Sequence, residues 1–372
     1  MLALGSVTEE LWYSHRRNSQ KRGDMKIGLF DHLERAPDRA LATQFDERLE
    51  FIAAADAAGY YCLHVAEHHS SPLNMVPEPG VWLAAVARAT RRIRLGPLVY
   101  LLTLYSPLRL AEEICMLDHL SKGRLEVGVG RGVSPFELNF HGVDHGNSRE
   151  IFFDAFDCLN KALSGDTFSH DGKYFTYEDV PMSLRPLQQP HPAYWYGSSN
   201  TTGATWAGEQ GMHFTANGQP ELAKENIDAF CTALTKRGAV AQPKAEFPGG
   251  AAIGLLRHIV VADTDVEAVR IAKPALEHHA ASLNWLRKRH GSSELNNRLN
   301  VHRGIDFESW REMKMVIAGN PDTVRAEIER QAHLLGINYL VAYLFFGTMT
   351  LADAMRSQQL LATEVMPKLV NF

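Results

Sequence analysis

The chain has 372 residues, of which 45% are hydrophobic and 22% charged, as is typical of a globular protein with a large core. Its formal net charge of −5 argues against a nucleic-acid partner, and no apolar run approaches the roughly 20 residues that a membrane helix needs. The four cysteines, Cys62, Cys115, Cys158 and Cys231, form no C-x-x-C pair, which argues against a zinc or dithiol motif. We expect reduced thiols in a cytoplasmic protein.

The first 24 residues differ from the rest of the chain. They are rich in basic side chains and contain no apolar segment of the kind that a secretory signal needs. We interpret residues 1–24 as a flexible N-terminal leader and residues 25–372 as the folded domain.

Strand-like and helix-like segments alternate through the first half of that domain. Short apolar runs predict strands at 25–30, 60–66, 93–102 and 125–129. Helical spacing predicts one helix at 45–58, which Gly59 ends, and another at 81–90. A third helix begins at Ser106 and Pro107, with the serine as its N-cap, and Gly123 ends it.

The second half repeats this alternation. Strands are predicted at 193–197, 212–215, 255–262 and 339–346, and helices at 152–163, near Thr205 and at 324–335. Residues 278–314 fit no simple βα unit, so we interpret them as an insertion before the last unit. Eight strands that alternate with helices indicate an α/β fold with parallel strands, a (β/α)8 or TIM barrel. In such a barrel the functional site lies at the carboxyl ends of the strands.

The segment Glu67-His68-His69 directly follows the second predicted strand. Together with His64 it matches the H-x-x-E-H pattern of a zinc peptidase class, but that pattern needs a helix to bring both histidines to one metal ion. On a strand, His64 and His68 would lie roughly 13 Å apart, so we predict no metal site. A solvated polar loop is the alternative. The position of the Glu67-His68-His69 segment at a strand end favours a role for His68 as an acid, a base or a hydrogen-bond donor.

A glycine-rich segment at residues 128–132 follows the fourth predicted strand. It begins like a dinucleotide fingerprint, but Val133 stands in place of the third glycine, which makes a Rossmann site a weak interpretation. Arg131 at a strand end can bind a phosphate through two hydrogen bonds. A purely structural glycine turn is the alternative.

Residues 197–203 connect the fifth predicted strand to a helix and are rich in small polar side chains. Free N–H groups at a helix start, together with Ser198, Ser199, Asn200 and Thr201, form a site for an anion such as a monophosphate. An ordinary helix-capping turn is the alternative. Arg131 favours the anion site, because both segments would follow parallel strands at the same end of the barrel.

These motifs, in this order, resemble those of the bacterial-luciferase-like, flavin-dependent monooxygenases. The block Leu-Asp-x-x-Ser-x-Gly-Arg at residues 117–124 and the Glu-His-His turn are the most specific pieces, and the resemblance runs from Met25 to the C-terminus. The other matching pieces are Pro107 to Arg109, Gly130-Arg131-Gly132, Asn147-Ser148-Arg149, Trp206-Ala207-Gly208-Glu209-Gln210-Gly211 and Ala318-Gly319-Asn320-Pro321.

The resemblance implies a barrel that binds reduced FMN from a separate flavin reductase or, in some branches of the family, the deazaflavin F420. In the FMN enzymes the flavin reacts with O2 to form a C4a-peroxyflavin, which oxidises a small organic substrate such as an aldehyde or a ketone. The resemblance also implies residue roles. His68 would be the catalytic histidine, Arg131 and residues 198–201 would bind the flavin phosphate, and Leu98-Val99 would form a non-proline cis peptide beneath the flavin ring.

Three functions follow from this resemblance. An FMN-dependent monooxygenase comes first, an F420-dependent oxidoreductase that transfers hydride comes second, and a non-catalytic partner subunit is disfavoured by the intact His68 and Arg131. Gly130 stands where the catalytic subunit of luciferase has a reactive cysteine, which weakens any prediction of light emission. We expect a homodimer or a heterodimer with a paralogous subunit, and we expect residues 278–314 to close over the flavin and shape the substrate cavity.

Overall fold

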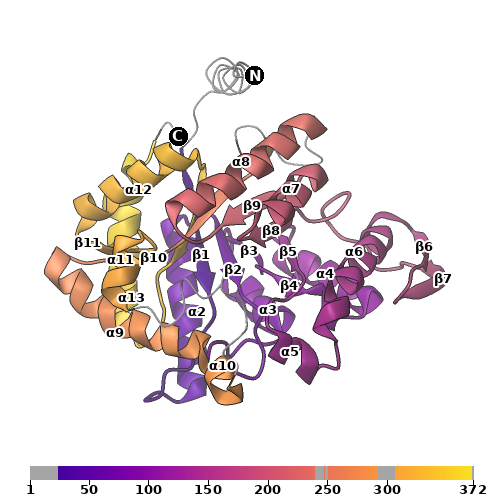
Figure 1. Cartoon of the computed structure of the whole chain (residues 1–372), viewed down its shortest axis with the longest axis horizontal. Helices are drawn as coiled ribbons and strands as arrows, with labels where there is room; N and C mark the ends of the chain where they lie inside the picture. Colours follow the sequence, from indigo (N-terminus) through magenta and orange to yellow (C-terminus); the bar gives the residue numbers. More distant parts are fainter. Residues whose placement is uncertain (1–23, 239–246, 248–249, 292–305, 371–372) are drawn as a thin grey trace.

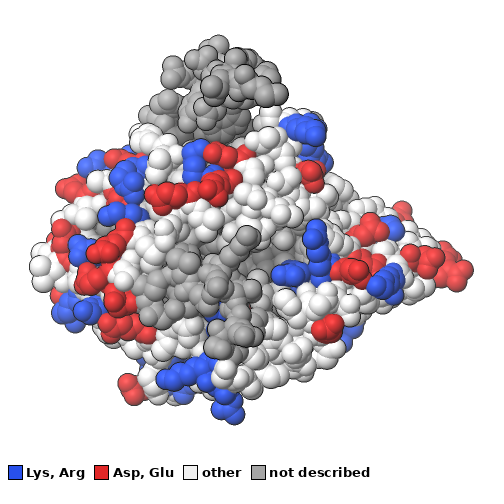
Figure 2. All heavy atoms as spheres, viewed as in Figure 1, with Lys and Arg blue, Asp and Glu red and all other residues white. Residues whose placement is uncertain are grey.

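The computed structural model describes residues 24–238, 247, 250–291 and 306–370. The predicted leader, residues 1–24, therefore lies outside the described residues except for Asp24, and so does the middle of the predicted insertion. The strands gather in the centre of the molecule and the helices surround them (Figure 1). Acidic and basic side chains are intermixed over the face that Figure 2 shows.

The central strands form a parallel barrel. Within the described residues, nine strands pair in the order β3-β2-β1-β12-β10-β9-β8-β5-β4, and a bridge between Leu95 and Leu125 closes the ring. Because β4 only continues β3, the ring has eight positions, and the predicted (β/α)8 barrel is confirmed. The strands are β1 (Lys26–Asp31), β2 (Cys62–Val65), β3 (Arg94–Pro97), β4 (Tyr100–Leu101), β5 (Val127–Gly130), β8 (Tyr194–Ser198), β9 (His213–Ala216), β10 (Ile253–Val261) and β12 (Tyr339–Tyr343).

Helices cover the outside of the barrel. Gly59 ends the first of them in a left-handed conformation, with φ of 88°, as the sequence predicts. Ser106 lies at the predicted N-cap of α4, but its hydroxyl bonds the Tyr177 hydroxyl and not the helix backbone. No described helix is both long and apolar enough to span a membrane. The helices are α2 (Leu41–Ala58), α3 (Pro79–Ala89), α4 (Pro107–Ser121), α5 (Pro135–Phe140), α6 (Ser148–Ser164), α7 (Thr201–Gln210), α8 (Pro220–Arg237), α9 (Asp265–Leu283), α10 (Trp285–His290), α11 (Phe307–Glu312), α12 (Pro321–Leu335) and α13 (Leu351–Leu360).

The third predicted strand, residues 93–102, is not continuous. It divides into β3 and β4, and the peptide bond between Leu98 and Val99 is cis, as the resemblance implies. Before the break, the Leu98 amide donates to the Val65 carbonyl at 2.7 Å. After it, the Leu101 amide donates to the Glu67 carboxylate at 3.1 Å. The apolar pattern continues through the break and therefore could not reveal it.

A further strand, β11 (Val316–Gly319), was not predicted. It pairs in parallel with the second half of β10, where His258 is in register with both Val316 and Tyr343. One edge of β10 therefore pairs with β12. The opposite edge pairs with β9 along the first half of β10 and with β11 along the second half. The boundary predicted for the insertion was also too early, because residues 278–283 belong to α9.

An antiparallel hairpin lies outside the barrel. Its strands are β6 (Thr167–Asp171) and β7 (Thr176–Pro181), and it projects from one edge of the molecule (Figure 1). The hairpin was not predicted, because most of its side chains are exposed or only partly buried and its sequence has no apolar run.

Candidate functional site

A pocket of about 1050 Å³ opens at the carboxyl ends of the barrel strands. Residues that end or follow most strands of the ring line it, among them His68 after β2, Leu98 after β3, Arg131 after β5 and Ser199 after β8. Ligand pockets for a single small molecule usually measure about 300–1,000 Å³, so this pocket has room for a large planar cofactor beside a small substrate. The pocket lies at the end of the barrel where the sequence analysis expects the functional site.

His68 is the third residue after the end of β2, and its side chain is 24% exposed. Its Nδ1 atom lies 3.2 Å from Oε1 and 3.3 Å from Oε2 of Glu137. Burial lowers the pKa of His68, but the carboxylates of Glu137 and, to a smaller extent, Glu67 together raise that pKa above its ordinary value. Burial likewise raises the pKa of Glu137, but His68 and the hydrogen bond from the His69 amide together lower that pKa. The pair therefore favours a proton on His68 and a charge on Glu137.

Glu137 belongs to α5, a short helix that the sequence pattern did not predict. Ser134 caps this helix by accepting a hydrogen bond from the Glu137 amide, and Pro135 follows the cap. Glu137 also accepts a hydrogen bond from the His69 amide at 3.0 Å, which fixes its carboxylate beside the turn after β2. The Ser134-Pro135 pair is the usual start of a helix and is the signal that could have revealed this element.

Glu67 joins the end of β2 to the broken third strand. Its side chain is buried and lies 2.9 Å from Nε2 of His69. Its other oxygen accepts hydrogen bonds from the Leu101 amide at 3.1 Å and the Tyr105 hydroxyl at 3.0 Å. Glu67 thus gives the Leu101 amide a partner beside the break in the third strand and is a structural support for the pocket wall.

The H-x-x-E-H pattern does not form a shared metal site here. His64 lies on strand β2, as predicted, and its Nε2 atom is 2.8 Å from the Tyr339 hydroxyl inside the barrel. His68 lies beyond the strand end and faces the pocket. The two histidines thus occupy different surroundings, and the helix that would bring them to one ion is not formed.

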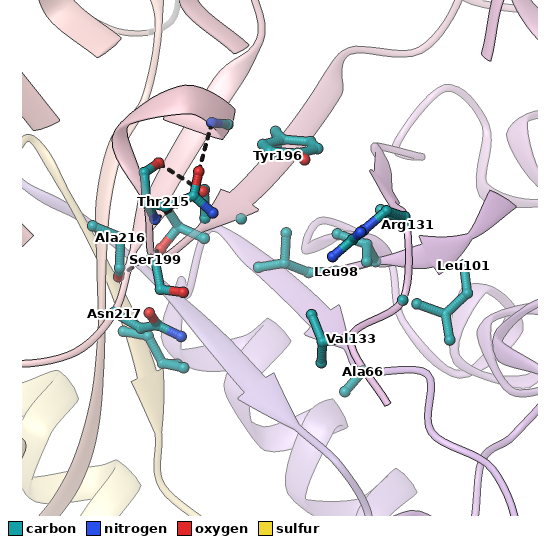
Figure 3. A pocket seen from close by; sticks show the side chains of 18 of the residues that line it. Ala66, Leu98, Leu101, Arg131, Val133, Tyr196, Ser199, Thr215, Ala216 and Asn217 are labelled. Atoms are coloured by element: carbon teal, nitrogen blue, oxygen red, sulfur yellow. Dashed lines mark hydrogen bonds between the residues drawn. The ribbon is translucent and has the colours of Figure 1, made fainter. Parts of the chain in front are cut away.

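Arg131 follows β5 and extends into the pocket (Figure 3). Its carbonyl accepts a hydrogen bond from the Thr103 hydroxyl at 2.9 Å, which fixes its backbone. The described residues provide no hydrogen-bond partner for its guanidinium. The neighbouring glycines also have a structural role: a Cβ atom on Gly128 would lie 2.3 Å from the Pro97 carbonyl oxygen. The structural interpretation therefore holds for Gly128, and phosphate binding by Arg131 stays a prediction.

The turn at residues 197–203 combines a helix cap with a pocket lining. The Asn200 side chain accepts a hydrogen bond from the Gly203 amide at 2.9 Å and so caps α7. The Ser198 hydroxyl is also engaged within the turn, since it bonds the Asn200 amide and carbonyl. Ser199 and Thr201 line the pocket as well. Because β5 and β8 pair in parallel, Arg131 and Ser199 follow neighbouring strand ends. Figure 3 shows both side chains at the pocket and the hydrogen bonds of the turn.

One wall of the pocket consists of nitrogen-bearing rings that the sequence pattern did not select. His258 lies 4.7 Å from His279 and 5.4 Å from Trp310, measured between ring centroids. The ring centroid of His32 lies 5.7 Å from that of His279 and 5.4 Å from that of His68. His279 and Trp310 come from the described ends of residues 278–314, so this segment does reach the cavity. We call His32, His258, His279 and Trp310 the ring wall.

Comparisons with known proteins identify relatives along the chain. Residues 25–339 match the model of the luciferase-like monooxygenases. The chain is 35% identical to protein y4wF of Sinorhizobium fredii over 92% of this chain and 97% of that protein. It is 28% identical to the oxygenase component of the flavin-dependent trigonelline monooxygenase of Acinetobacter baylyi, over 66% of this chain and 67% of that protein.

Two solved structures share the fold. The oxygenating constituent of 3,6-diketocamphane monooxygenase from Pseudomonas putida, in complex with FMN, has a TM-score of 0.75 at 22% identity and covers 93% of this chain and 99% of its own. The F420-dependent tetrahydromethanopterin reductase from Methanopyrus kandleri has a TM-score of 0.68 at 17% identity, with coverage of 93% and 99%. The family match runs from the start of β1 to the start of β12. The chain therefore belongs to the family of luciferase-like monooxygenases.

Proposed function

We propose that this protein is an oxygenase that uses reduced FMN and O2 to transfer one oxygen atom to a small organic substrate, with water and oxidised FMN as the other products. The relative from Acinetobacter baylyi is named as the oxygenase component of a flavin-dependent monooxygenase. That name supports a separate flavin reductase as the source of reduced FMN here too. A shared-fold structure from Pseudomonas putida holds FMN, which supports the choice of cofactor.

The residues at one end of the pocket fit a flavin phosphate. The guanidinium of Arg131 has no partner among the described residues, and a phosphate would supply two acceptors for it. The start of α7 offers backbone N–H groups, and Ser199 and Thr201 add hydroxyl donors beside them. Leu98 and Val99, at the cis bond between β3 and β4, would contact the flavin ring. Ser198 and Asn200 would hold the turn in shape.

The residues at the other end of the pocket fit the proposed oxygen-transfer reaction. Reduced FMN, when bound, supplies the two electrons that O2 needs. His68 holds a proton at the pocket surface, with Glu137 behind it, and can donate a hydrogen bond to oxygen atoms that gain negative charge. The observation that carries the proposal is one pocket with two ends. At one end lies Arg131, whose guanidinium has no partner among the described residues, beside the turn at residues 197–203, and at the other lies His68, backed by the Glu137 carboxylate.

An F420-dependent oxidoreductase on the same fold is the second candidate, and a reductase of that kind shares this architecture. The tail of F420 is long and acidic, and would need a strongly basic groove. We call residues 197–203 the phosphate turn. The charged side chains that line the pocket near it are two arginines, Arg131 and Arg149, and one carboxylate, Glu209. Two positive charges and one negative charge leave a net charge of +1 among these three residues, which favours a monophosphate.

Anaerobic titration of the full chain with photoreduced FMN, and separately with reduced F420, tests the proposal. We expect saturable binding of reduced FMN, weaker binding of F420, and reoxidation of the bound flavin by O2 at a rate that differs from that of free flavin. A panel of small substrates under 18O2 should then give a product with one heavy oxygen atom. Binding of F420 alone would favour the hydride-transfer candidate, and binding of neither would favour a non-catalytic partner subunit.

A further inference from the structure

The ring wall shares two histidines with a buried cluster of metal-ligand side chains. Within the described residues, His32, Glu34 and His279 each offer one ligand atom, and these three atoms lie within 4.8 Å of one another. The three residues are 8%, 1% and 3% exposed. His32 and Glu34 follow strand β1, whereas His279 belongs to α9, 245 residues after Glu34. The fold therefore brings two distant segments together at a group that shares no residue with the H-x-x-E-H pattern.

Two atoms of this cluster have no hydrogen-bond partner among the described residues, namely Nδ1 of His32 and Oε2 of Glu34. Both atoms are buried, so solvent does not supply the missing partner, and an unpartnered buried polar atom costs free energy. An ionised carboxylate presents electron pairs on both oxygens, and Nδ1 of His32 presents one when the ring proton is on Nε2. A cation enclosed between these two atoms would satisfy both of them, and it would need no opening to the pocket.

The charge states of the cluster suit a cation. Burial lowers the pKa of His32 well below its ordinary value, so the ring is neutral. Burial raises the pKa of Glu34, but the charges of His279 and His278 and the hydrogen bonds to Glu34 together lower that pKa, so this side chain is ionised at neutral pH. Metal ions bind histidine in its neutral form and glutamate in its ionised form.

The hydrogen bonds already present in the cluster are compatible with a bound ion. Oε1 of Glu34 lies 2.7 Å from Nδ1 of His279 and accepts a hydrogen bond from the Tyr343 hydroxyl at 2.7 Å. With its proton on Nδ1, His279 donates to Glu34 and keeps the electron pair of Nε2 for a metal. Metal-binding histidines usually donate their other ring N–H to a carboxylate or a carbonyl, and metal-binding carboxylates are hydrogen-bonded in turn. Oε2 of Glu34 then serves as the ligand atom while Oε1 keeps its two partners.

We propose that His32, Glu34 and His279 bind one divalent transition-metal ion, for which Zn²⁺ is the best fit. Two imidazole nitrogens and one carboxylate oxygen are a common zinc ligand set, whereas Ca²⁺ and Mg²⁺ prefer oxygen ligands. Zinc holds such atoms at about 2.0–2.2 Å in a tetrahedron, so side-chain shifts of about 1 Å would close the cluster around the ion. His258 offers a further nitrogen, because its Nε2 atom has no partner among the described residues and its ring centroid lies 4.7 Å from that of His279.

The ion would lie in the wall of the pocket. His32 and His279 line the pocket, and the ring centroid of His32 lies 5.4 Å from that of His68. Shared ligation would tie α9 to the turn after β1 and so fix one side of the cavity. The metal site goes beyond the proposed function and does not rest on it.

Metal titration of the untagged full chain tests this proposal. The chain is treated with a chelator and then titrated with Zn²⁺, and separately with Mg²⁺, by isothermal titration calorimetry. We expect one tightly bound Zn²⁺ per chain and no comparable binding of Mg²⁺, because histidine ligands do not suit Mg²⁺. Co²⁺ in place of Zn²⁺ should give the strong visible absorption bands of a four-coordinate ion. No bound Zn²⁺, or only the weak bands of six-coordinate cobalt, would overturn the proposal and leave an internal water as the partner of the two atoms.

Variants of the cluster make the test specific. Glu34→Gln and His279→Gln each remove a ligand, so each should weaken Zn²⁺ binding by about 10- to 100-fold or more. Zn²⁺ should also raise the unfolding temperature of the wild-type chain and not that of either variant. His333→Asn is the control, because this histidine lies on α12 and is exposed. Unchanged Zn²⁺ affinity in both cluster variants would contradict the proposal, and if a variant does not fold, the cobalt spectrum of the wild-type chain decides.

The same samples separate this proposal from the proposed function. If Zn²⁺ binds to the cluster but reduced FMN does not bind, the metal site stands and the oxygenase proposal fails. If reduced FMN binds but Zn²⁺ does not, the oxygenase proposal stands and the metal site fails.

Discussion

His68 and Glu137 are 69 residues apart in the chain, yet Nδ1 of one lies 3.2 Å from Oε1 of the other at the mouth of the barrel. Glu137 raises the pKa of His68, so the charged pair stabilises the fold fully below the ordinary histidine pKa and is lost as the pH rises through the raised value. The pair therefore couples the protonation of the pocket to a helix outside the barrel strands.

Glu137→Gln should lower the pKa of His68, because the carboxylate that contributes most to raising it is removed while burial still acts against the charged ring. Titration of the histidine ring by NMR measures this shift directly, and the pH profile of product formation should move to lower pH. Glu150→Gln is the control, since Glu150 is exposed and pairs with Lys173. A pH profile that does not move would remove Glu137 from its positioning role.

His68→Ala should leave the binding of reduced FMN nearly unchanged and lower the yield of oxygenated product. The physical reason is that in the proposed reaction His68 would hold the proton beside the reacting oxygen, whereas Arg131 and the turn at residues 197–203 would bind the flavin phosphate. Stopped-flow measurement of flavin oxidation, with product analysis of the same samples, checks both parts. An unchanged product yield would exclude His68 as the catalytic residue.

Arg131→Ala should weaken the binding of reduced FMN by about 10- to 100-fold, the usual effect of losing hydrogen bonds between charged groups. Riboflavin lacks the phosphate, so its affinity should stay the same. Arg131→Lys should restore only part of the FMN affinity, because lysine cannot form two parallel hydrogen bonds. Arg330→Ala on α12 is the control. Equal losses for FMN and riboflavin would mean that Arg131 acts through packing and not through the phosphate.

Glu67→Ala should destabilise the protein by about 2–4 kcal/mol, because the Leu101 amide and the Tyr105 hydroxyl would lose their acceptor in a buried place. Glu67→Gln keeps an acceptor oxygen and should cost clearly less. Urea unfolding at neutral pH gives both values, with exposed Glu364→Ala as the control. Similar midpoints for Glu67→Ala and the wild-type protein would show that solvent replaces these contacts.

Gly128→Ala should reduce stability and flavin binding together, because the new Cβ atom would lie 2.3 Å from the Pro97 carbonyl oxygen and 3.0 Å from Cα of Leu98. Gly197→Ala is the matched control at a neighbouring strand end. Its Cβ atom would meet only the Thr215 methyl group, at an ordinary 3.5 Å. Thermal unfolding and FMN titration of both variants distinguish a steric requirement from a general sensitivity of the site.

The barrel could be predicted because each of its strands is a short apolar run next to a helix signal. The position of His68, Arg131 and Ser199 at strand ends followed from the same pattern and the direction of parallel strands. The ring wall could not be predicted in this way. His258 lies on a predicted strand, but its neighbours His279 and Trp310 reach it only through α9 and the return of the chain in β11. The dimer, the cytoplasmic location and the roles of the cofactor residues stay predictions.

The chain leaves β10, passes through α9, α10 and α11, and returns as β11 to the edge of the same strand, where Val261 and Gly319 are in register. Both ends of this excursion are therefore fixed side by side, whatever the length of chain between them. Residues can be gained or lost there without any change in strand order elsewhere in the ring. His279 and Trp310 belong to this segment between β10 and β11, whereas Arg131 and residues 197–203 lie outside it. We expect substrate preference to be exchangeable between proteins of this architecture by grafting this one segment, with the cofactor end left intact.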